Sequence, residues 1–252
     1  MGNTAQNRIA LITGGAQGIG LACAQALLDA GNRVAVTDIQ PLDLAHFPEE
    51  QRSRVMSAVL DVSDTPGHAV FCARMQKDWG NIGILVNNAG MSDKKNGQTA
   101  RVMDVGLDEW RRVLDVNLNS MFRLCQVVAP RMQEAGWGRI VNISSLAGRT
   151  ISRVAGVTYS VSKAGIVALT RNLANELGPL GITVNTVAPG RVVTPLALRG
   201  SEEINKEYAA AIPVRRLGTV EEVAAAVAFL ASEITGFING ATIDINGGYF
   251  MP

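Results

Sequence analysis

The sequence holds few of the residues that build disulfide frameworks and metal centres. Among 252 residues there are three cysteines and two histidines, and no Cys-x-x-Cys pair or His-rich cluster offers the spacing of a metal site. Cys23, Cys72 and Cys125 lie far apart in apolar helical stretches, where cysteine packs as a small apolar residue. We therefore expect buried, reduced cysteines and no metal at His46 or His68.

Charge of one sign and long apolar runs are also missing. Lys and Arg number 23 against 22 Asp and Glu, a formal net charge of +1, so there is no basic field for a nucleic acid backbone. No window reaches the roughly 20 apolar residues of a membrane span, and residues 1–7 are polar. These absences predict a cytoplasmic protein with a small-molecule substrate and with neither nucleic acid nor membrane as a partner.

Apolar residues, by contrast, make up 47% of the chain, enough for a large core. Short β-branched runs alternate with longer helical patterns, an order typical of βαβ units in a parallel sheet. The predicted strands are residues 8–13, 33–38, 55–60, 82–87, 139–144, 182–187 and 242–245. The predicted helices include 19–30, 108–134, 159–177 and 220–231, the last one capped by Thr219.

No internal repeat or linker divides this pattern. It predicts an α/β fold class: a single doubly wound, Rossmann-type domain over residues 1–252, with a seven-stranded parallel sheet and helices on both faces. Two polar, irregular stretches follow strand ends, at residues 90–106 and 190–216. Because ligands bind beyond the carboxyl ends of parallel strands, we expect the site there, with residues 190–216 as a substrate lid.

A glycine-rich turn follows the first predicted strand and runs into a helix, with the sequence Thr13-Gly14-x-x-x-Gly18-x-Gly20. Gly14 permits a sharp turn, Gly18 lets a pyrophosphate approach the backbone, and Gly20 lets the helix pack closely on the sheet. The helix N-terminus then points at the anion. The spacing differs from G-x-G-x-x-G and an ordinary tight turn is the alternative, but the strand before and the helix after favour a dinucleotide site.

Asp38 ends the second predicted strand, eighteen positions after Gly20. A carboxylate at this place accepts hydrogen bonds from the adenosine ribose of NAD. It would repel the 2′-phosphate of NADP by about 4 kcal/mol per charge pair, and Gln17 supplies no compensating cation. The pattern predicts NAD and disfavours NADP, although aspartate also ends strands for structural reasons alone.

Tyr159 and Lys163 are four residues apart in a predicted helix, so both project from one face. A phenol has a pKa near 10, and service as a base near neutral pH requires a depression of roughly 3 units, or about 4 kcal/mol. One ammonium at about 4 Å supplies an attraction of about that size. A solvated Tyr and Lys on a helix surface is the alternative for the pair taken alone.

Together these motifs resemble the short-chain dehydrogenase/reductase family, in its compact, single-domain, 3-oxoacyl reductase-like branch. The resemblance runs along essentially the whole chain. Beyond the glycine-rich turn and the Tyr159-x-x-x-Lys163 pair, it is carried by Asp61-Val62, Asn87-Asn88-Ala89-Gly90, Asn117, Ser145, Pro189-Gly190, Thr194 and Asn246-Gly247-Gly248.

The resemblance implies a catalytic set of Asn117, Ser145, Tyr159 and Lys163. Tyr159 would be the general acid/base, and Lys163 would lower its pKa and bind the nicotinamide ribose. Ser145 would hydrogen-bond the substrate oxygen, and Asn117 would hold a proton-relay water. Ser144 is the competing serine, but the position of the strand end favours Ser145.

The resemblance also implies the cofactor and substrate contacts. The expected cofactor contacts are Gly14, Gln17, Gly18, Ile19, Gly20, Asp38, Ile39, Asp61, Val62, Asn88, Ala89, Gly90, Tyr159, Lys163, Pro189, Gly190, Val192 and Thr194. Residues 146–158 are expected to line the substrate pocket. With Ser145, Arg149 and Arg153 are candidate contacts for an anionic or polyol substrate, and simple solvation of both arginines is the alternative.

Within the family, 3-oxoacyl reductases generally use NADPH and present basic residues to an acidic carrier protein. Asp38 departs from the first expectation, and the surface segments 133–137 and 178–180 depart from the second. We therefore expect an NAD-dependent dehydrogenase for a secondary alcohol or ketone of polyol, sugar or hydroxy-acid type. The alternative is an NADPH-dependent 3-oxoacyl reductase, and a remoter one is a catalytically silent dinucleotide-binding regulator.

The family resemblance further implies a homotetramer. The predicted helix 108–134 carries apolar residues such as Leu118 and Phe122 on more than one face, and residues 245–252 form an apolar end. Packing within the chain is the alternative for both.

Overall fold

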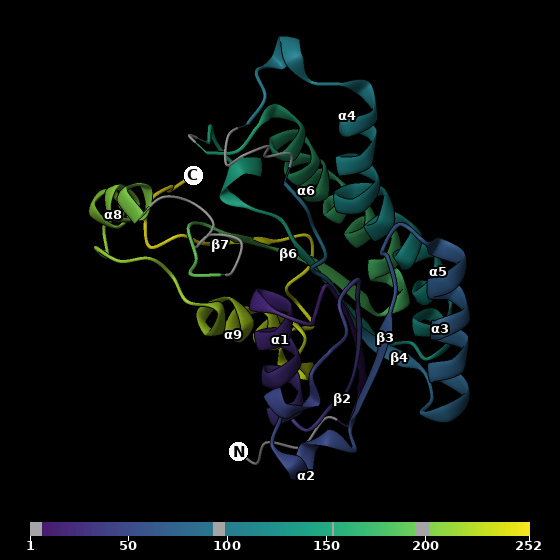
Figure 1. The fold of residues 1–252 in the computed structure, drawn as a ribbon. Helices are drawn as coiled ribbons and strands as arrows, with labels where there is room; N and C mark the ends of the chain where they lie inside the picture. The colour runs from purple at the N-terminus through teal and green to yellow at the C-terminus, as the bar shows by residue number, and fades with distance from the viewer. Residues whose placement is uncertain (1–6, 93–98, 153, 195–201) are drawn as a thin grey trace.

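A seven-stranded parallel sheet runs through the structure, a computed structural model that describes residues 7–92, 99–152, 154–194 and 202–252 (Figure 1). The strand order is β3-β2-β1-β4-β5-β6-β7. The bounds are β1 (Ile9–Thr13), β2 (Arg33–Asp38), β3 (Val55–Val59), β4 (Ile82–Asn87), β5 (Gly138–Ile143), β6 (Ile182–Pro189) and β7 (Thr242–Ile245). The order reverses between β1 and β4, the switch point of a doubly wound sheet. The predicted fold class is confirmed.

The described helices are α1 (Gly18–Asp29), α2 (Glu49–Arg52), α3 (Thr65–Asp78), α4 (Leu107–Leu114), α5 (Ser120–Glu134), α6 (Val157–Leu177), α8 (Glu202–Ala211) and α9 (Val220–Leu230). Short turns of helix lie between them: η1 (Leu44–His46), η2 (Val102–Asp104), η3 (Asp115–Asn119), η4 (Leu146–Gly148), η5 (Gly178–Leu180) and η6 (Glu233–Thr235). Figure 1 shows α1 and α9 side by side, with α3 and α5 together on the other side of the molecule.

Helices cover both faces of the sheet, which explains why its central strands β1, β4 and β5 are buried at every residue instead of at alternate ones. In β1, Ala10 and Ile12 pack in one core cluster with α1 and α9, whereas Ile9 and Leu11 pack in a second cluster with α3, α5 and α6. All five residues of β1 are buried. The predicted cap of α9 is present, because the Thr219 hydroxyl accepts from the Glu222 N–H at 3.3 Å.

The predicted helical stretch over residues 108–134 is present, but it is not one uniform α-helix. The structure has α4, then the π-helical turn η3, then α5. The N–H of Ser120 bonds to the carbonyl oxygen of Asp115, five residues back, so the turn is one residue wider than an α-helical turn. The apolar spacing did not reveal this widening because the helix axis continues through it. Asn117 lies inside the turn, and such π turns are frequent at functional sites.

The prediction that residues 190–216 are irregular is also wrong in part, because α8 lies within them. This helix is short, with a polar, acidic first turn at Glu202 and Glu203 and one buried residue, Tyr208. A sequence pattern with so few apolar positions resembles a polar loop. The stretch 90–106 likewise contains the single helical turn η2.

The three cysteines are buried free thiols, as expected. Burial raises the pKa of Cys23 and Cys125 to about 12 and that of Cys72 to about 11, so all three stay protonated near neutral pH. None of the helices in the described part of the chain combines the length and the apolar character needed to cross a membrane.

Candidate active site

The glycine-rich turn between β1 and α1 has the backbone of an anion-binding loop. Gly14 and Gly18 have φ values of +64° and +58°, a region that favours glycine. A Cβ on Gly20 would overlap the carbonyl oxygen of Gly14, so the helix packs here only without a side chain. Gln17 is the N-cap of α1, and its side chain makes no capping hydrogen bond. The first N–H groups of the helix are therefore left without a side-chain cap, which suits a pyrophosphate.

The turn after β4 is joined to this loop by four hydrogen bonds. The Asn88 side-chain amide donates to the carbonyl oxygens of Thr13 at 3.0 Å and Gly14 at 2.8 Å. The Thr13 hydroxyl accepts from the backbone N–H groups of Asn88 and Ala89, both at 3.1 Å. The bonds tie together the ends of β1 and β4, on either side of the switch point, where a dinucleotide binds in doubly wound sheets.

Asp38 lies at the end of β2, next to the glycine-rich turn. One of its carboxylate oxygens accepts from the N–H of Ala16 and the other from the N–H of Gln40, both at 3.0 Å. The residue is 9% exposed. A carboxylate oxygen accepts more than one hydrogen bond, so this fixed carboxylate keeps acceptor sites for ribose hydroxyls.

Asp61 lies at the end of the neighbouring strand β3, followed by Val62. A hydrogen bond from the Ser63 hydroxyl, with help from Arg112, lowers the pKa of Asp61 to about 2. The Arg112 guanidinium on α4 lies 2.8 Å from the Asp61 carboxylate. Asp61 is therefore an anion at all physiological pH values, and it connects the segment after β3 with α4.

Lys163 and Tyr159 both lie in the first half of α6. The Lys163 ammonium donates to the carbonyl oxygen of Ile143, at the end of β5, at 2.9 Å. It lies 5.6 Å from the centroid of the Tyr159 ring. A Cβ on Gly90 would be 3.4 Å from both Lys163 Nζ and Asn117 Oδ1, so these three residues from three segments meet at one point.

Asn117 is fully buried and is held in place by its whole amide group. Its Oδ1 accepts from the Met91 N–H at 2.8 Å, and its Nδ2 donates to the Met91 carbonyl oxygen at 3.0 Å. Nδ2 also donates to the Ser162 hydroxyl at 3.0 Å, and that hydroxyl donates to the carbonyl oxygen of Tyr159 at 2.7 Å. The π turn is thus fastened both to the loop after β4 and to the helix that carries Tyr159.

The two adjacent serines have different surroundings. Ser144 is 3% exposed, and its hydroxyl donates to the carbonyl oxygen of Lys163 at 2.7 Å. Ser145 is half-buried, caps the turn η4 and accepts from the Ala147 N–H at 3.2 Å. The Ser144 hydroxyl is engaged with the backbone of α6, which leaves Ser145 as the serine with an accessible hydroxyl.

The two candidate substrate arginines have separate outcomes. Arg149 forms a two-point ion pair with Asp244 of β7, with both nitrogen–oxygen distances at 3.1 Å and side chains 17% and 13% exposed. Its guanidinium is therefore committed within the chain. Arg153 lies outside the described residues.

Two of the predicted cofactor contacts lie just after β6. The N–H of Gly190 donates to the carbonyl oxygen of Ile245, and Val192 is buried at 5% exposure.

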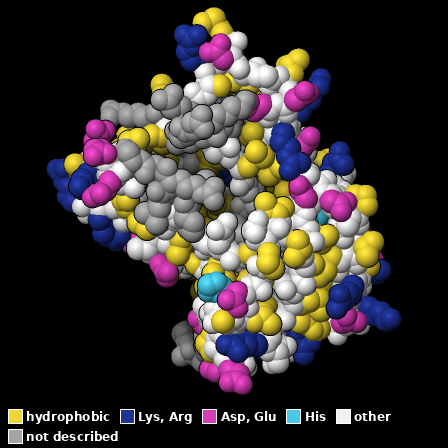
Figure 2. All heavy atoms as spheres, viewed as in Figure 1, with side chains coloured by type: hydrophobic (Ala, Val, Ile, Leu, Met, Phe, Trp, Pro, Cys, Tyr) yellow, Lys and Arg dark blue, Asp and Glu magenta, His cyan; other side chains and the backbone are white. Residues whose placement is uncertain are grey.

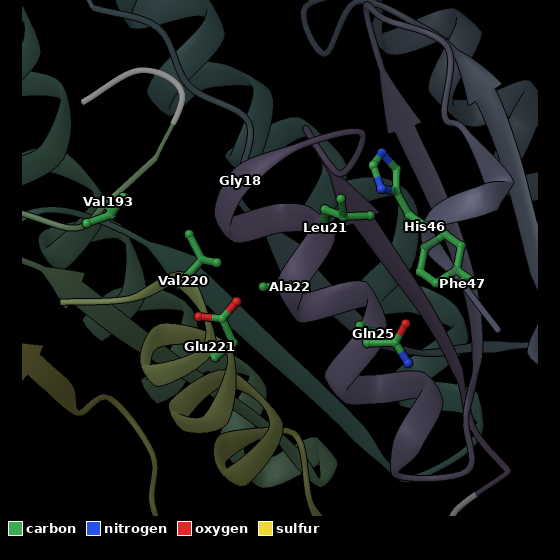
Figure 3. A pocket seen from close by; sticks show the side chains of 9 residues that line it. All are labelled: Gly18, Leu21, Ala22, Gln25, His46, Phe47, Val193, Val220 and Glu221. Carbon is green, nitrogen blue, oxygen red and sulfur yellow. The ribbon is translucent and has the colours of Figure 1, made fainter. Parts of the chain in front are cut away.

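A cavity of about 360 Å³ borders the glycine-rich turn on the outer face of α1 (Figure 3). Figure 3 shows Leu21 and Gln25 of α1 between His46 on one side and Val220 with Glu221 on the other. The lining is completed by Gly18, Ala22, Phe47 and Val193. Gly18 belongs to the predicted cofactor contacts, and Val193 lies between two others. Tyr159, Lys163 and Asn117 do not line this cavity; their meeting point is defined by the hydrogen bonds above.

Sequence reasoning missed several residues that hold the site. His68 was expected in a polar segment, but it is fully buried, with Nε2 at 3.2 Å from the hydroxyl of Thr37, which precedes Asp38. Ser162 and Arg112 hold Asn117 and Asp61. Each acts between elements that are distant in sequence, so no local pattern marks them.

The doubly wound sheet, the glycine-rich turn and the Tyr159–Lys163 pair on α6 together define a nicotinamide-dependent oxidoreductase, and the chain belongs to the short-chain dehydrogenase/reductase family. Residues 14–250 match the family model described as Enoyl-(Acyl carrier protein) reductase. Members of the family act on keto and hydroxy groups.

Similar proteins extend over nearly the whole chain. Nodulation protein G of Azospirillum brasilense is 39% identical, over 96% of this chain and 97% of the relative. Acetoacetyl-CoA reductase of Rhizobium meliloti is 39% identical, over 97% and 99%. The crystal structure of a 3-oxoacyl-(acyl-carrier protein) reductase with bound NAD from Brucella melitensis is 38% identical, with a TM-score of 0.90 over 99% of this chain and 94% of that one.

The burial of Lys163 leads to a prediction about stability. Burial lowers the pKa of its ammonium to about 8, which corresponds to a cost of about 3 kcal/mol for keeping it charged in the fold. This cost is fully present below pH 8. It disappears as the pH rises to the pKa of lysine in the unfolded chain, because that lysine then also loses its proton. We expect Lys163→Met to raise the free energy of unfolding at pH 7 by about 1–2 kcal/mol, after loss of the Ile143 hydrogen bond.

Urea unfolding measured from pH 7 to about pH 9.5 checks this expectation, and the difference between the variant and the wild type should narrow as the pH rises. Lys77→Met, at an exposed position on α3, is the matched control and should change stability by less than about 0.5 kcal/mol. A Lys163→Met protein that is less stable than the wild type at pH 7 would contradict this expectation, because it would show that the buried ammonium does not destabilise the fold.

Proposed function

We propose that the protein is an NAD-dependent oxidoreductase that transfers a hydride between nicotinamide and a secondary alcohol or ketone of polyol, sugar or hydroxy-acid type. The observation that carries this proposal is the meeting of a buried Lys163 ammonium, the Tyr159 ring and the fastened Asn117 amide beside Gly90. A pure binding module has no physical need for these groups together, which disfavours the silent regulator.

In this proposal the bound nicotinamide accepts or supplies the hydride, and the protein handles the proton. Tyr159 takes the proton from a substrate hydroxyl during oxidation and returns it to a substrate oxygen during reduction. Lys163 favours the tyrosinate electrostatically and binds the nicotinamide ribose. Ser145 donates to the substrate oxygen, and Asn117 holds the water through which the proton reaches solvent.

The cofactor residues of the proposal follow the two sides of the switch point. Gly14, Gln17, Gly18, Ile19 and Gly20 hold the pyrophosphate, and Asp38, Ile39, Asp61 and Val62 hold the adenosine. Asn88, Ala89, Gly90, Pro189, Gly190, Val192 and Thr194, with Tyr159 and Lys163, surround the nicotinamide half. The uncapped N-terminus of α1 and the fixed Asp38 carboxylate support this placement.

NAD preference rests on the charge at Asp38. Its two oxygens are held by backbone N–H groups on both sides, so the carboxylate has little freedom to turn away from a phosphate. At about 4 Å and an effective dielectric of about 20, each charge pair contributes about 4 kcal/mol of repulsion. The NAD bound to the Brucella melitensis relative is in line with this preference.

A second candidate is a 3-oxoacyl thioester reductase, because relatives named for 3-oxoacyl and acetoacetyl-CoA reduction cover nearly the whole chain. The ion pair of Arg149 with Asp244 also removes one predicted contact for an anionic substrate.

The carrier-protein form of this activity is not supported by residues 133–137. Trp137 there packs against two guanidiniums, with Arg8 at 4.1 Å and Arg139 at 4.5 Å from its ring centroid, and Arg139 is 4% exposed. Figure 2 likewise shows acidic and basic side chains intermixed around the face it presents.

The predicted homotetramer stays a prediction. The exposed apolar side chains of Phe122 on α5 and Phe229 on α9, each 45% exposed, are the kind of surface that such an assembly would cover.

Removal of the phenol hydroxyl tests the chemistry. We expect Tyr159→Phe to lose nearly all turnover while it binds NADH within about twofold of the wild type, because the ring and its packing remain. Steady-state kinetics and NADH fluorescence titration measure the two effects. More than about a tenth of the wild-type kcat in this variant would contradict a general acid/base role for Tyr159.

Cofactor preference is tested at the adenosine ribose. We expect the wild type to have a higher kcat/KM with NAD than with NADP, and Asp38→Asn to raise the NADP-to-NAD ratio by about a thousandfold as the repulsion of about 4 kcal/mol disappears. Asp43→Asn removes a charge from the exposed cap of η1 and should leave the ratio within about twofold. A wild type that prefers NADP would show that Asp38 does not set the cofactor.

The substrate class is tested by nicotinamide absorbance, with NAD against polyols, sugar acids and hydroxy acids, and with NADH or NADPH against acetoacetyl-CoA. The first proposal expects NAD-linked oxidation in the alcohol arm. Turnover confined to acetoacetyl-CoA would replace it with the second candidate, and turnover of acetoacetyl-CoA with NADPH alone would overturn the cofactor assignment as well.

A further inference from the structure

The last residues of the chain form a turn that touches several segments of the proposed site. After β7, Asn246 organises this C-terminal turn: its Oδ1 accepts from the N–H of Gly248 at 2.9 Å and its Nδ2 donates to the carbonyl oxygen of Phe250 at 3.0 Å. The N–H of Tyr249 donates to the Asn246 carbonyl oxygen at 3.2 Å. The end of the chain is thus an ordered structural part, and it is not an extended tail.

Two glycines let this turn lie directly against the segment that follows α8. Gly247 and Gly248 have φ values of +63° and +85°. A Cβ on Gly247 would come within 2.6 Å of side-chain atoms of Ile212 and Val214. The N–H of Val214 also donates to the carbonyl oxygen of Gly247 at 3.3 Å. Side chains larger than glycine have no room here, so the turn and the end of α8 are packed backbone to side chain.

An aromatic pair extends this contact to α8 itself. The rings of Tyr249 and Tyr208 stack, with centroids 5.5 Å apart and planes at 28°. Tyr208 is the buried residue of α8. Figure 1 shows α8 beside the C-terminus and apart from the other helices. Stacked aromatic pairs of this geometry stabilise packing beyond the area that they bury.

The opposite end of the contact is the loop after β6, where the nicotinamide half of the cofactor is proposed to lie. The guanidinium of Arg191, next to Gly190, lies 5.6 Å from the centroid of the Tyr208 ring. Its Nε and Nη2 donate to the Asn205 side chain of α8, at 3.0 Å and 2.8 Å. Tyr208 therefore receives contacts both from the nicotinamide-side loop and from the C-terminal turn.

On its other side, the C-terminal turn contacts the start of residues 146–158, the predicted lining of the substrate pocket, which we call the substrate loop. The ring centroid of Phe250 lies 5.6 Å from the guanidinium of Arg149, the residue that ends η4 and is paired with Asp244. Residues 246–250 thus lie between the start of the substrate loop and α8, the two segments that border the crevice on the side away from the adenosine.

We propose that Tyr249 is a positioning residue for substrate: by stacking on Tyr208 it holds α8 against the nicotinamide-side loop and so shapes the substrate side of the crevice, with no contribution to cofactor binding. This inference rests on the proposed function, because it places a ketone or alcohol substrate between α8 and the substrate loop. The ring of Tyr249, and not its hydroxyl, carries the effect.

Three variants separate the ring from its surroundings. Tyr249→Leu removes the aromatic stack but keeps an apolar side chain, and Tyr249→Phe keeps the stack and removes the hydroxyl. Met251→Ala changes a side chain of the same chain end that is 77% exposed and serves as the matched control. Each protein is studied with NADH bound.

Hydrogen exchange of the backbone amides measures whether α8 depends on Tyr249. We expect residues 202–211 to exchange about fivefold faster in Tyr249→Leu, in line with the loss of one aromatic stack, and to be unchanged in Tyr249→Phe and Met251→Ala. The exchange of β1 and α1 should not change in any variant. Unchanged exchange of α8 in Tyr249→Leu would overturn the proposal.

Kinetics with acetoacetyl-CoA as the ketone probe measure whether the effect reaches substrate. We expect Tyr249→Leu to raise the KM for acetoacetyl-CoA by about fivefold, with the KM for NADH within about twofold of the wild type, and Tyr249→Phe to restore both values. An equal rise in both KM values would mean a general loss of structure and would overturn a substrate-side role. A wild type that does not reduce acetoacetyl-CoA speaks against the second candidate function, and the same comparison of KM values is then made with NAD and the alcohol that the wild type oxidises, where an unchanged KM for that alcohol in Tyr249→Leu would overturn the substrate-side role.

Discussion

The buried ammonium of Lys163 is the constraint on which the site depends. A charge that is removed from water needs fixed partners, and here the carbonyl oxygen of Ile143 at the end of β5 accepts one of its hydrogens. The helix backbone at this point is held by the Ser144 hydroxyl and by Gly148, where a Cβ would overlap the backbone of Lys163. The same desolvation that costs stability strengthens the electrostatic effect of the ammonium on a nearby phenol, since a low dielectric screens it less. In the proposed reaction, the cost in stability and the activation of Tyr159 would thus have one cause.

The other polar groups of the crevice are fixed in the same way, by bonds between elements that are distant in sequence. The side-chain amide of Asn117 accepts from the Met91 N–H and donates to the Met91 carbonyl oxygen, which holds the π turn to the loop after β4. The Asn88 side chain joins that loop to the glycine-rich turn. Because buried amides pay a large penalty when unpaired, each pair tolerates little displacement. These bonds therefore join the ends of β1 and β4 in one rigid polar framework.

Sequence reasoning succeeded where the signal was local. The alternation of strands and helices gave the sheet, all seven strands included, and the glycine spacing placed the turn where Gly14 and Gly18 have positive φ. It failed where the determinant is a tertiary contact. The amide of Asn117, inside the π turn, bonds across to Met91, and apolar spacing does not record such a bond. Arg149 was a candidate for substrate because residues 146–158 were expected to line the substrate pocket, and its partner Asp244 is 95 residues away on β7.

The two sides of the proposed crevice differ in how they are held. On the side of β1 and β4, side-chain amides and hydroxyls bond to backbone groups. On the side of α8, ring stacking and side-chain contacts join this helix to the C-terminal turn and to Arg191. Stacking and apolar contacts tolerate changes of residue better than an amide pair does, because they leave no unpaired polar group when altered. In the proposed function, substitutions on α8 and in the turn would therefore reshape the substrate wall while Lys163, Asn117 and the glycine-rich turn stay in place.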